Sequence, residues 1–195
     1  MKTTRLIIVA VGGQGNLLAS RILGEAALAD GVPVRMSEIH GMAQRGGVVE
    51  SAVLFGDGES TLISDGEADV LVGFEPVETL RALNKCSAAT TVITNLAEVP
   101  PFTVAIGRGA YPNLDELQRL IRSKTARLIA FDAAAMAKAA GNIMAVNMVL
   151  LGALCRTGLV PVKAETVKTA ITQRSKPAFL ETNLRAFEMG VDAAA

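Results

Sequence analysis

The chain opens with a continuous apolar segment that runs directly into a cluster of glycines. Residues 5–11 read Arg-Leu-Ile-Ile-Val-Ala-Val, a composition typical of a parallel strand buried on both faces. Gly12-Gly13-Gln14-Gly15 follows as a tight turn, and residues 16–29 predict a helix that Asp30-Gly31 ends. A second strand is expected over residues 32–37. This strand–helix–strand order indicates an α/β fold with a largely parallel sheet.

The rest of the chain predicts one domain over residues 1–195. Residues 48–55 alternate in polarity, and Gly56-Asp57-Gly58 forms a turn from which residues 60–64 return as a hairpin. The fold class expected is α/β: a single domain with a mostly parallel, Rossmann-like sheet, helices on both faces, an antiparallel excursion near 48–64 and a helical C-terminal third. The other expected strands cover 69–74, 90–95, 102–106 and 127–131, and the other expected helices cover 76–85, 114–123, an Ala-rich helix capped by Asp132, 142–156, 163–174 and 177–193.

Charge and hydropathy exclude several classes of partner. The chain has 19 basic and 19 acidic residues, so it lacks the basic excess typical of nucleic-acid binding. Its longest apolar run, residues 143–155, contains Asn147 and Gly152 and falls short of the roughly 18 residues that a membrane helix needs. We therefore expect no nucleic acid, no membrane and a cytoplasmic location. Hydrophobic residues make up 50% of the chain, and a partner chain is expected to cover the surplus apolar surface.

The two cysteines do not indicate a metal site. Cys86 and Cys155 are far apart, no Cys-x-x-Cys occurs, and the chain has one histidine. Structural zinc and iron–sulfur clusters normally need four thiolate or imidazole ligands. We expect two reduced thiols and no metal bound by this chain alone.

A second polar loop is expected at residues 37–47, Ser-Glu-Ile-His-Gly-Met-Ala-Gln-Arg-Gly-Gly. Here Glu38 is predicted to orient the ring of His40 and to raise its pKa. Gln44 and Arg45 supply an amide and a guanidinium that can pair with an anion or with a partner's carboxylate. Since both loops would follow neighbouring strands, one binding crevice is expected.

The glycine loop leaves alternatives open. Gly12, Gly13 and Gly15 expose backbone N–H groups at a helix N-terminus, where phosphate binds readily. In the dinucleotide pattern G-x-G-x-x-G, Ala10 replaces the first glycine, while Glu38 stands near the place of a ribose-binding carboxylate. The loop therefore fits a stand-alone NAD(P)-dependent oxidoreductase, a different phosphate-bearing ligand, or an interaction scaffold with an empty turn.

Two segments have the spacing of a thiamine-diphosphate motif but lie in elements that do not suit such a site. Gly56-Asp57-Gly58 precedes Asn84 at the distance that thiamine-diphosphate enzymes use to hold Mg²⁺. The first element is, however, an ordinary hairpin turn, and Asn84 ends a predicted helix. There is also no Gly-x-Ser-x-Gly elbow and no P-loop. The sequence thus holds no complete catalytic set.

Taken together, the two loops resemble the gamma domain of 2-oxoacid:ferredoxin oxidoreductases, and most closely the indolepyruvate branch. The resemblance rests on Gly12 to Gly15 and on Ser37 to Gly47, within which the run from His40 onward is specific, and it extends to residues 66–76 and 147–152. It covers most of the chain. Ala10 departs from the family pattern, whose glycine loop usually opens with glycine.

The resemblance implies an accessory subunit without catalytic residues. The complete enzyme would decarboxylate a 2-oxoacid, with indolepyruvate or another aryl pyruvate implied by this branch, reduce ferredoxin and form an acyl-CoA. A large partner subunit would carry thiamine diphosphate, Mg²⁺ and the iron–sulfur clusters, while this chain would help to bind coenzyme A. The implied phosphate-holding or partner-lining residues are Gly12, Gly13, Gln14 and Gly15, and those facing the crevice shared with the large subunit are Glu38, His40, Gln44 and Arg45.

A substitution tests the assignment of the second loop. We expect Arg45→Ala to weaken subunit assembly or to lower the CoA-dependent rate of the reconstituted enzyme, because the anionic partner would lose the guanidinium that pairs with it. Titration of the partner subunit and steady-state kinetics measure the two effects. If both stay at the wild-type level, the loop does not face the crevice.

Overall fold

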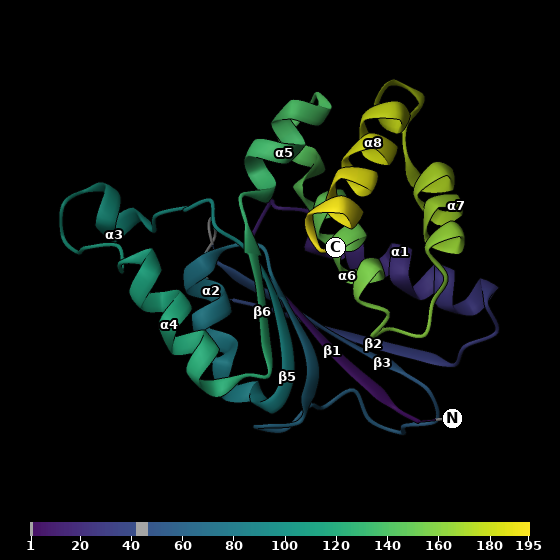
Figure 1. Cartoon of the computed structure of the whole chain (residues 1–195), viewed down its shortest axis with the longest axis horizontal. Coiled ribbons are helices and arrows are strands. Elements are labelled where there is room, and N and C mark those ends of the chain that lie inside the picture. Colours follow the sequence, from purple (N-terminus) through teal and green to yellow (C-terminus); the bar gives the residue numbers. More distant parts are fainter. Residues whose placement is uncertain (1, 42–46) are drawn as a thin grey trace.

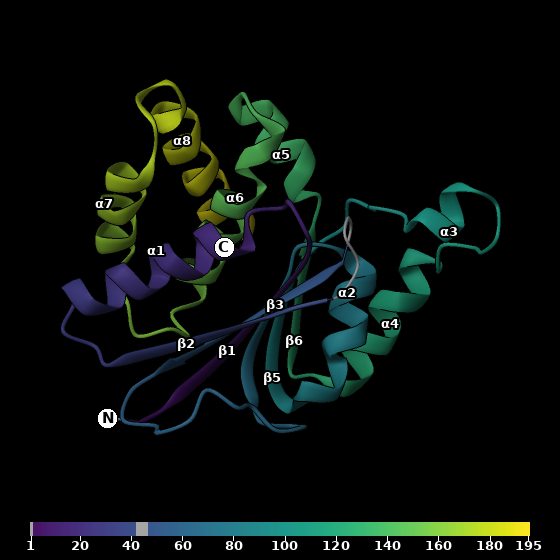
Figure 2. The same ribbon diagram turned by 180° about the vertical axis from the view of Figure 1, so that it is seen from behind.

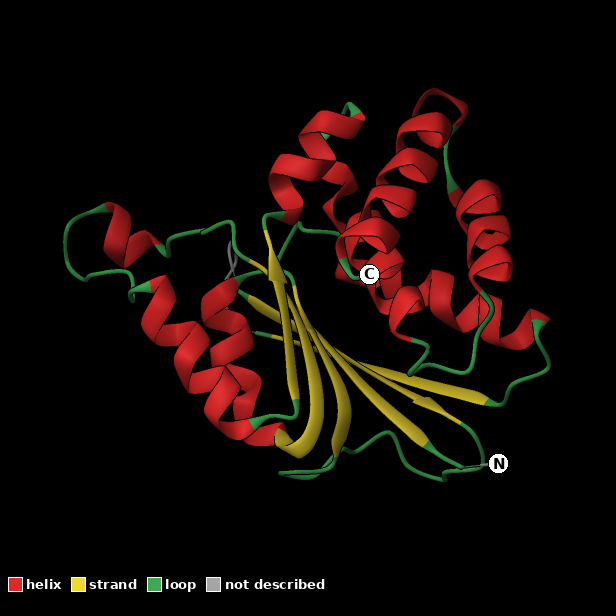
Figure 3. Cartoon of the chain, viewed as in Figure 1, coloured by secondary structure: helices red, strands yellow, loops and turns green. Residues whose placement is uncertain are grey.

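In the computed structural model, which describes residues 2–41 and 47–195, one sheet organises the chain. Its described strands are β1 (Thr4–Val11), β2 (Val34–His40), β3 (Val48–Phe55), β4 (Ala68–Gly73), β5 (Cys86–Asn95) and β6 (Arg127–Phe131). They form a six-stranded sheet in the order β2-β3-β1-β4-β5-β6 (Figure 3). The pairs β1–β4, β4–β5 and β5–β6 are parallel, whereas β3 runs antiparallel to both of its neighbours.

Helices cover both faces of this sheet, as the sequence predicts (Figures 1 and 2). One face carries the larger apolar cluster, packed beneath α1 (Asn16–Ala29), α5 (Ala133–Ala140), α6 (Val146–Thr157), α7 (Ala164–Arg174) and α8 (Pro177–Ala193). The other face carries a smaller cluster beneath α2 (Pro76–Arg81), the 3₁₀ turn η1 (Ala82–Lys85) and α4 (Leu114–Lys124). The last third of the chain is helical, as expected. No described helix is both long enough and apolar enough to cross a bilayer.

Side-chain caps explain where several helices begin. Glu75 accepts a hydrogen bond from the N–H of Glu78 at the start of α2, and Pro76 occupies its first turn. Asn113 caps α4 in the same way. The predicted cap is confirmed at α5, where the Asp132 carboxylate accepts from the N–H of Ala135 at 2.8 Å.

The predicted hairpin is wrong in its second half. Strand β3 does not return along residues 60–64; it lies between β2 and β1, pairing Glu38 with Ser51 and Ile8 with Ser51. Residues 60–64 form no strand, because β2 and β1 already occupy both edges of β3. Two further expectations are wrong. β1 and β2 are not neighbours in the sheet, and β2 continues to His40, so the second loop begins later than predicted.

Two further elements differ from expectation. Residues 102–106 are not a strand; Phe102–Ala105 form the short helix α3. The preceding Pro100 and Pro101 favour a turn over a sheet strand, and β5 already has β6 on its outer edge. The helix expected over 142–156 is divided, since Asn142 caps the 3₁₀ turn η2 (Ile143–Ala145) before α6 begins.

The crossing of α6 and α8 supports the larger apolar cluster. A Cβ at Gly190 would lie 1.8 Å from the Val149 carbonyl oxygen, and a Cβ at Gly152 would lie 1.9 Å from the Phe187 carbonyl oxygen. The two backbones therefore approach so closely that only glycine fits at either position.

We expect Gly190→Ala to destabilise the fold by on the order of 3 kcal/mol, because the added methyl group forces the two helices apart. Urea denaturation measures the change. The matched control is Gly109→Ala, whose new Cβ would lie 3.7 Å from a Val104 methyl group. Equal unfolding midpoints for the two variants would show that α6 and α8 do not cross this closely.

Candidate ligand site at the carboxyl edge of the sheet

The sheet has a topological switch point between β1 and β4. The chain leaves β1 towards α1 on one face and leaves β4 towards α2 on the opposite face. In open α/β sheets, ligands bind in the crevice outside the carboxyl ends of such strands. The glycine loop lies at this point, because it joins β1 to α1.

Glycine is required in this loop for two separate reasons. Gly13 has φ 98° and Gly15 has φ 86°, a left-handed conformation that other residues seldom adopt. A Cβ at Gly15 would also lie 2.6 Å from the Asn147 side-chain nitrogen, which brings α6 against the loop. Gly15 begins α1 without a side-chain cap. Among the described residues, the N–H groups of Gly13 and Gly15 have no hydrogen-bond partner, so they are available to an anion.

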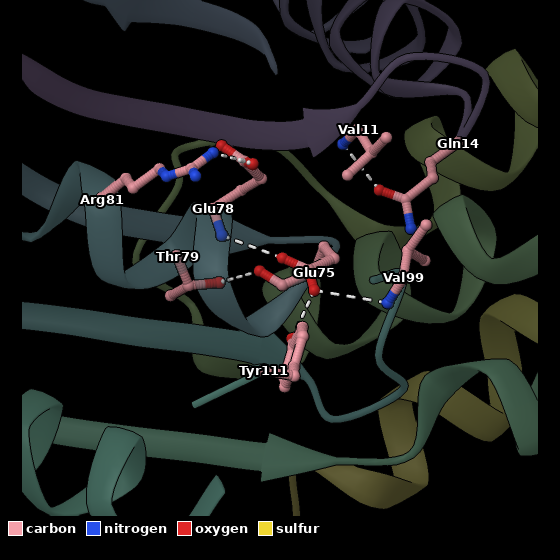
Figure 4. Close-up of polar contacts among 8 residues, drawn as sticks. All are labelled: Val11, Gln14, Glu75, Glu78, Thr79, Arg81, Val99 and Tyr111. Atoms are coloured by element: carbon pink, nitrogen blue, oxygen red, sulfur yellow. Dashed lines mark hydrogen bonds and ion pairs between the residues drawn. The ribbon is translucent and has the colours of Figure 1, made fainter. Parts of the chain in front are cut away.

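The side chain of Gln14 is used within the protein. Its Oε1 accepts the N–H of Val11 at 2.8 Å (Figure 4), and its Nε2 donates to the carbonyl of Phe74 at 3.2 Å. The amide thus links the ends of β1 and β4. Any contribution of Gln14 to a ligand comes from its backbone and from the shape of the loop.

Asn95, at the end of β5, completes this link and was not predicted as a site residue. Its Nδ2 also donates to the Phe74 carbonyl, at 3.0 Å, and its Oδ1 accepts the N–H groups of Ala97 and Ala133. The available signal was an asparagine directly after a buried strand. Together, Gln14 and Asn95 fix the floor of the crevice.

A cavity of about 320 Å³ opens beside the glycine loop. Its lining is mostly apolar, and the one charged side chain among its described lining residues is Glu98. Ile143 and Met144 of η2 are 52% and 62% exposed at its rim. The cavity therefore suits an uncharged chain, while the loop beside it offers anion-binding N–H groups. The lining residues are Gly13, Gln14, Asn95, Ala97, Glu98, Val99, Ala134, Ile143, Met144 and Val146.

The flanks of the second loop reach the same edge of the sheet. The N–H of Gly12 donates to the Gly47 carbonyl at 2.9 Å, because β3 runs antiparallel beside β1. The Glu38 carboxylate lies 3.6 Å from Nε2 of His40, so the structure brings this predicted pair together. Gln44 and Arg45 lie outside the described residues, and their roles remain predictions.

The thiols and the acidic groups provide no redox or metal centre among the described residues. Burial raises the pKa of Cys86 to about 11 and that of Cys155 to about 12, so both thiols stay protonated and unreactive near neutral pH. No group of three or more His, Cys, Asp or Glu side chains in the described ranges is arranged to hold a metal ion.

A buried acidic cluster borders the cavity on the side of α2 (Figure 4). Glu75 is 1% exposed, and its carboxylate accepts the Tyr111 hydroxyl and the N–H of Val99. Burial, with the Glu75 carboxylate next, raises the pKa of Tyr111. Burial also raises the pKa of Glu78, against the opposing effect of Arg81. This cluster was missed at the level of sequence, because its members are far apart along the chain.

The fold is that of the small subunits of 2-oxoacid oxidoreductases. The gamma subunit of a keto/oxoacid ferredoxin oxidoreductase from Geobacter sulfurreducens superposes with a TM-score of 0.71 at 26% identity, over 98% of each chain. The pyruvate oxidoreductase subunit PORC of Thermotoga maritima shares the fold with a TM-score of 0.73 at 24% identity, over 98% of this chain and 97% of that one. The whole of this chain also superposes on part of the 2-oxoglutarate:ferredoxin oxidoreductase of Magnetococcus marinus, with a TM-score of 0.76 at 19% identity. The superposed part is 31% of that chain and shows the shared fold.

Sequence comparison gives the family directly. The family model described as pyruvate ferredoxin/flavodoxin oxidoreductase matches residues 5–193. Relatives in Pyrococcus horikoshii and Thermococcus kodakarensis, each called indolepyruvate oxidoreductase subunit IorB, are 42% and 43% identical over all of this chain and 97% of theirs. The chain therefore belongs to this family, and within it to the small, gamma-type subunits, as its resemblance implies. The family consists of thiamine-diphosphate and iron–sulfur oxidoreductases.

The family match supports the accessory-subunit interpretation over the stand-alone NAD(P)-dependent alternative, and the sheet order gives a physical reason. In a dinucleotide-binding fold the ribose-binding carboxylate follows the strand beside β1. Here β3 lies between β1 and β2, so Glu38 stands two strands away from the glycine loop. That separation is roughly 10 Å at the usual strand spacing.

The single tyrosine provides a test of the buried cluster. The chain has one Tyr and no Trp, so its tyrosinate absorbance reports on Tyr111 alone. We expect the native chain to keep this proton well above pH 10, whereas the chain unfolded in guanidinium titrates near the ordinary value of about 10. Since the folded state holds the proton more tightly, its stability falls as the pH rises above about 10. A native titration midpoint near the ordinary value would mean that Tyr111 is not buried against Glu75.

Proposed function

We propose that this chain is the accessory subunit of a 2-oxoacid:ferredoxin oxidoreductase that acts on an aryl pyruvate such as indolepyruvate. The names of the relatives at 42% and 43% identity support this substrate class. The complete enzyme would convert a 2-oxoacid, coenzyme A and oxidised ferredoxin into an acyl-CoA, carbon dioxide and reduced ferredoxin in the cytoplasm. Thiamine diphosphate, Mg²⁺ and iron–sulfur clusters would reside on a large partner subunit, where the substrate side chain is also selected.

This chain's own contribution is to hold coenzyme A at the carboxyl edge of the sheet. The observation that carries the proposal is the pairing of two unlike surfaces, the glycine loop at the start of α1 and the adjoining cavity of about 320 Å³. Coenzyme A combines the same two chemistries, since its pyrophosphate is anionic and its pantetheine arm is uncharged.

The charges set the orientation of the ligand. The N–H groups of Gly13 and Gly15, together with the positive end of the α1 dipole, favour phosphate at the loop. Glu98 faces the cavity and repels phosphate from it, so the uncharged arm occupies that space. The chain places the ligand, and the reacting groups belong to the partner subunit.

A pair of glycine substitutions tests this proposal in the assembled enzyme. Gly13 and Gly31 both have positive φ, and a Cβ at either position meets no atom within 4 Å. Only Gly13 lines the cavity. We expect Gly13→Asp to raise the KM for coenzyme A at least about tenfold, or ~1.4 kcal/mol, because its carboxylate repels the phosphates. Gly31→Asp also places a side chain at positive φ, 70° against 98° at Gly13, and should leave that KM unchanged.

Calorimetric titration of coenzyme A into the assembled enzyme supplies the second readout. The proposal requires a weaker dissociation constant for Gly13→Asp than for Gly31→Asp. Equal KM values and equal dissociation constants for the two variants would show that the loop does not contact coenzyme A.

A further inference from the structure

Residues 97–113, called here the arm, connect β5 to α4 and project away from the sheet with α3 at their tip (Figures 1 and 2). The helix α3 forms no packed interface with another helix or strand among the described residues. The arm therefore adds little to the core of its own chain. Its base is nevertheless held to the sheet by hydrogen bonds.

One buried carboxylate holds both sides of the base. Oε1 of Glu75 accepts the N–H of Val99, at 3.3 Å, on the outgoing side, and it accepts the Tyr111 hydroxyl on the returning side. Oε2 accepts the N–H of Glu78 at 2.9 Å, which anchors the carboxylate to the first turn of α2 (Figure 4). The two ends of the arm are thereby fixed to the carboxyl edge of the sheet.

The tip is a preformed apolar knob. The N–H of Ile106 donates to the carbonyl of Phe102 at 3.0 Å, and Gly107 ends the turn in the left-handed conformation with φ 74°. Phe102 and Ile106 are four residues apart, so they share one face of the turn. They are 76% and 45% exposed. A Phe side chain left in water forgoes the free energy of its burial, which a docked partner would recover.

The charges on the arm argue against a second copy of this chain and against a membrane as its partner. The one acidic residue of the arm, Glu98, lies at its base and lines the cavity, and from residue 99 to residue 113 Arg108 is the one ionisable side chain apart from Tyr111. In a contact between two copies, tip against tip, the two Arg108 cations would face each other. A single cation and one Phe are also a weak anchor for a membrane surface, because attraction to anionic lipids depends on clusters of several basic residues.

We propose that the arm docks this chain onto another subunit of the same oxidoreductase. Phe102 and Ile106 enter an apolar pocket of that subunit, and Arg108 meets carboxylates at its rim. Because the base is fixed by Glu75, little conformational entropy is lost on docking. This inference rests on the proposed function, since it requires the chain to work within a complex. It concerns the tip of the arm, which does not line the coenzyme A cavity, whereas residues 97–99 at the base do.

The test is reconstitution of the complex from the full chain and its purified partner subunit, with the dissociation constant measured by titration. We expect Phe102→Ser to raise that constant at least about tenfold and Ile106→Ser to raise it less. The matched controls are Leu62→Ser and Phe179→Ser, whose side chains are 78% and 45% exposed outside the arm. Both controls should assemble as the wild type does. Thermal unfolding should be the same for all four variants, since none of these side chains belongs to the core.

A second variant tests how much the base of the arm contributes to assembly, independently of the tip. Tyr111→Phe removes one of the two contacts that fasten the arm and leaves the tip unchanged. We expect it to weaken assembly by a smaller factor than Phe102→Ser does, because the N–H of Val99 still fastens the other side of the base to Glu75.

The outcomes distinguish this inference from the function on which it rests. If the wild-type chain assembles and Phe102→Ser assembles equally well, the arm is not the docking element, although the proposed function stands. Loss of self-association, or of binding to anionic vesicles, in Phe102→Ser with an unchanged heterocomplex would also overturn the inference. If the wild-type chain binds no partner subunit, both the inference and the proposed function fail.

Discussion

Hydrogen bonds at the end of β4 hold together the carboxyl edge of the sheet, which carries the glycine loop, the cavity and the arm. The Phe74 carbonyl accepts hydrogen bonds from Gln14 and Asn95, so one oxygen ties together the ends of β1, β4 and β5. The next residue, Glu75, is buried and fastens both sides of the arm. The two consecutive residues thus fix the glycine loop, the wall of the cavity and the projecting tip relative to one another. A buried carbonyl and a buried carboxylate are stable here because donors satisfy both.

This arrangement explains how a chain without a complete catalytic set can serve an oxidoreductase. Its described residues offer a place for an anionic ligand with an uncharged tail and a separate apolar knob. The thiols are held protonated by burial. The balanced charge and the apolar surplus of the sequence agree with a chain that positions a ligand and a partner rather than reacting groups.

The sequence predicted those parts of the fold whose cause is local. The opening strand, the glycine turn and the first helix follow from hydrophobic periodicity and from glycine conformations, and Asp132 is an unambiguous cap. The position of β3 could not be predicted in this way, because alternation identifies a strand but not the neighbours with which it pairs. The structure placed β3 between β2 and β1, and this separated Glu38 from the glycine loop.

The same distinction applies to the site. Gly13 and Gly15 were predictable from their type and spacing, whereas Asn95, Glu75 and Tyr111 act through contacts between residues distant in sequence. Gln14 was expected to hold phosphate or to line the partner contact. Its side-chain amide instead forms hydrogen bonds with the ends of β1 and β4. Gln44 and Arg45 lie outside the described residues and keep the roles that the family resemblance implies as predictions.

The most direct measurement is to tag this chain in its native cell, purify it under native conditions and determine what elutes with it. Our account predicts a stoichiometric large subunit that contains thiamine diphosphate and shows the visible absorbance of iron–sulfur clusters. Elution of the chain by itself, or with bound nicotinamide cofactor, would contradict it.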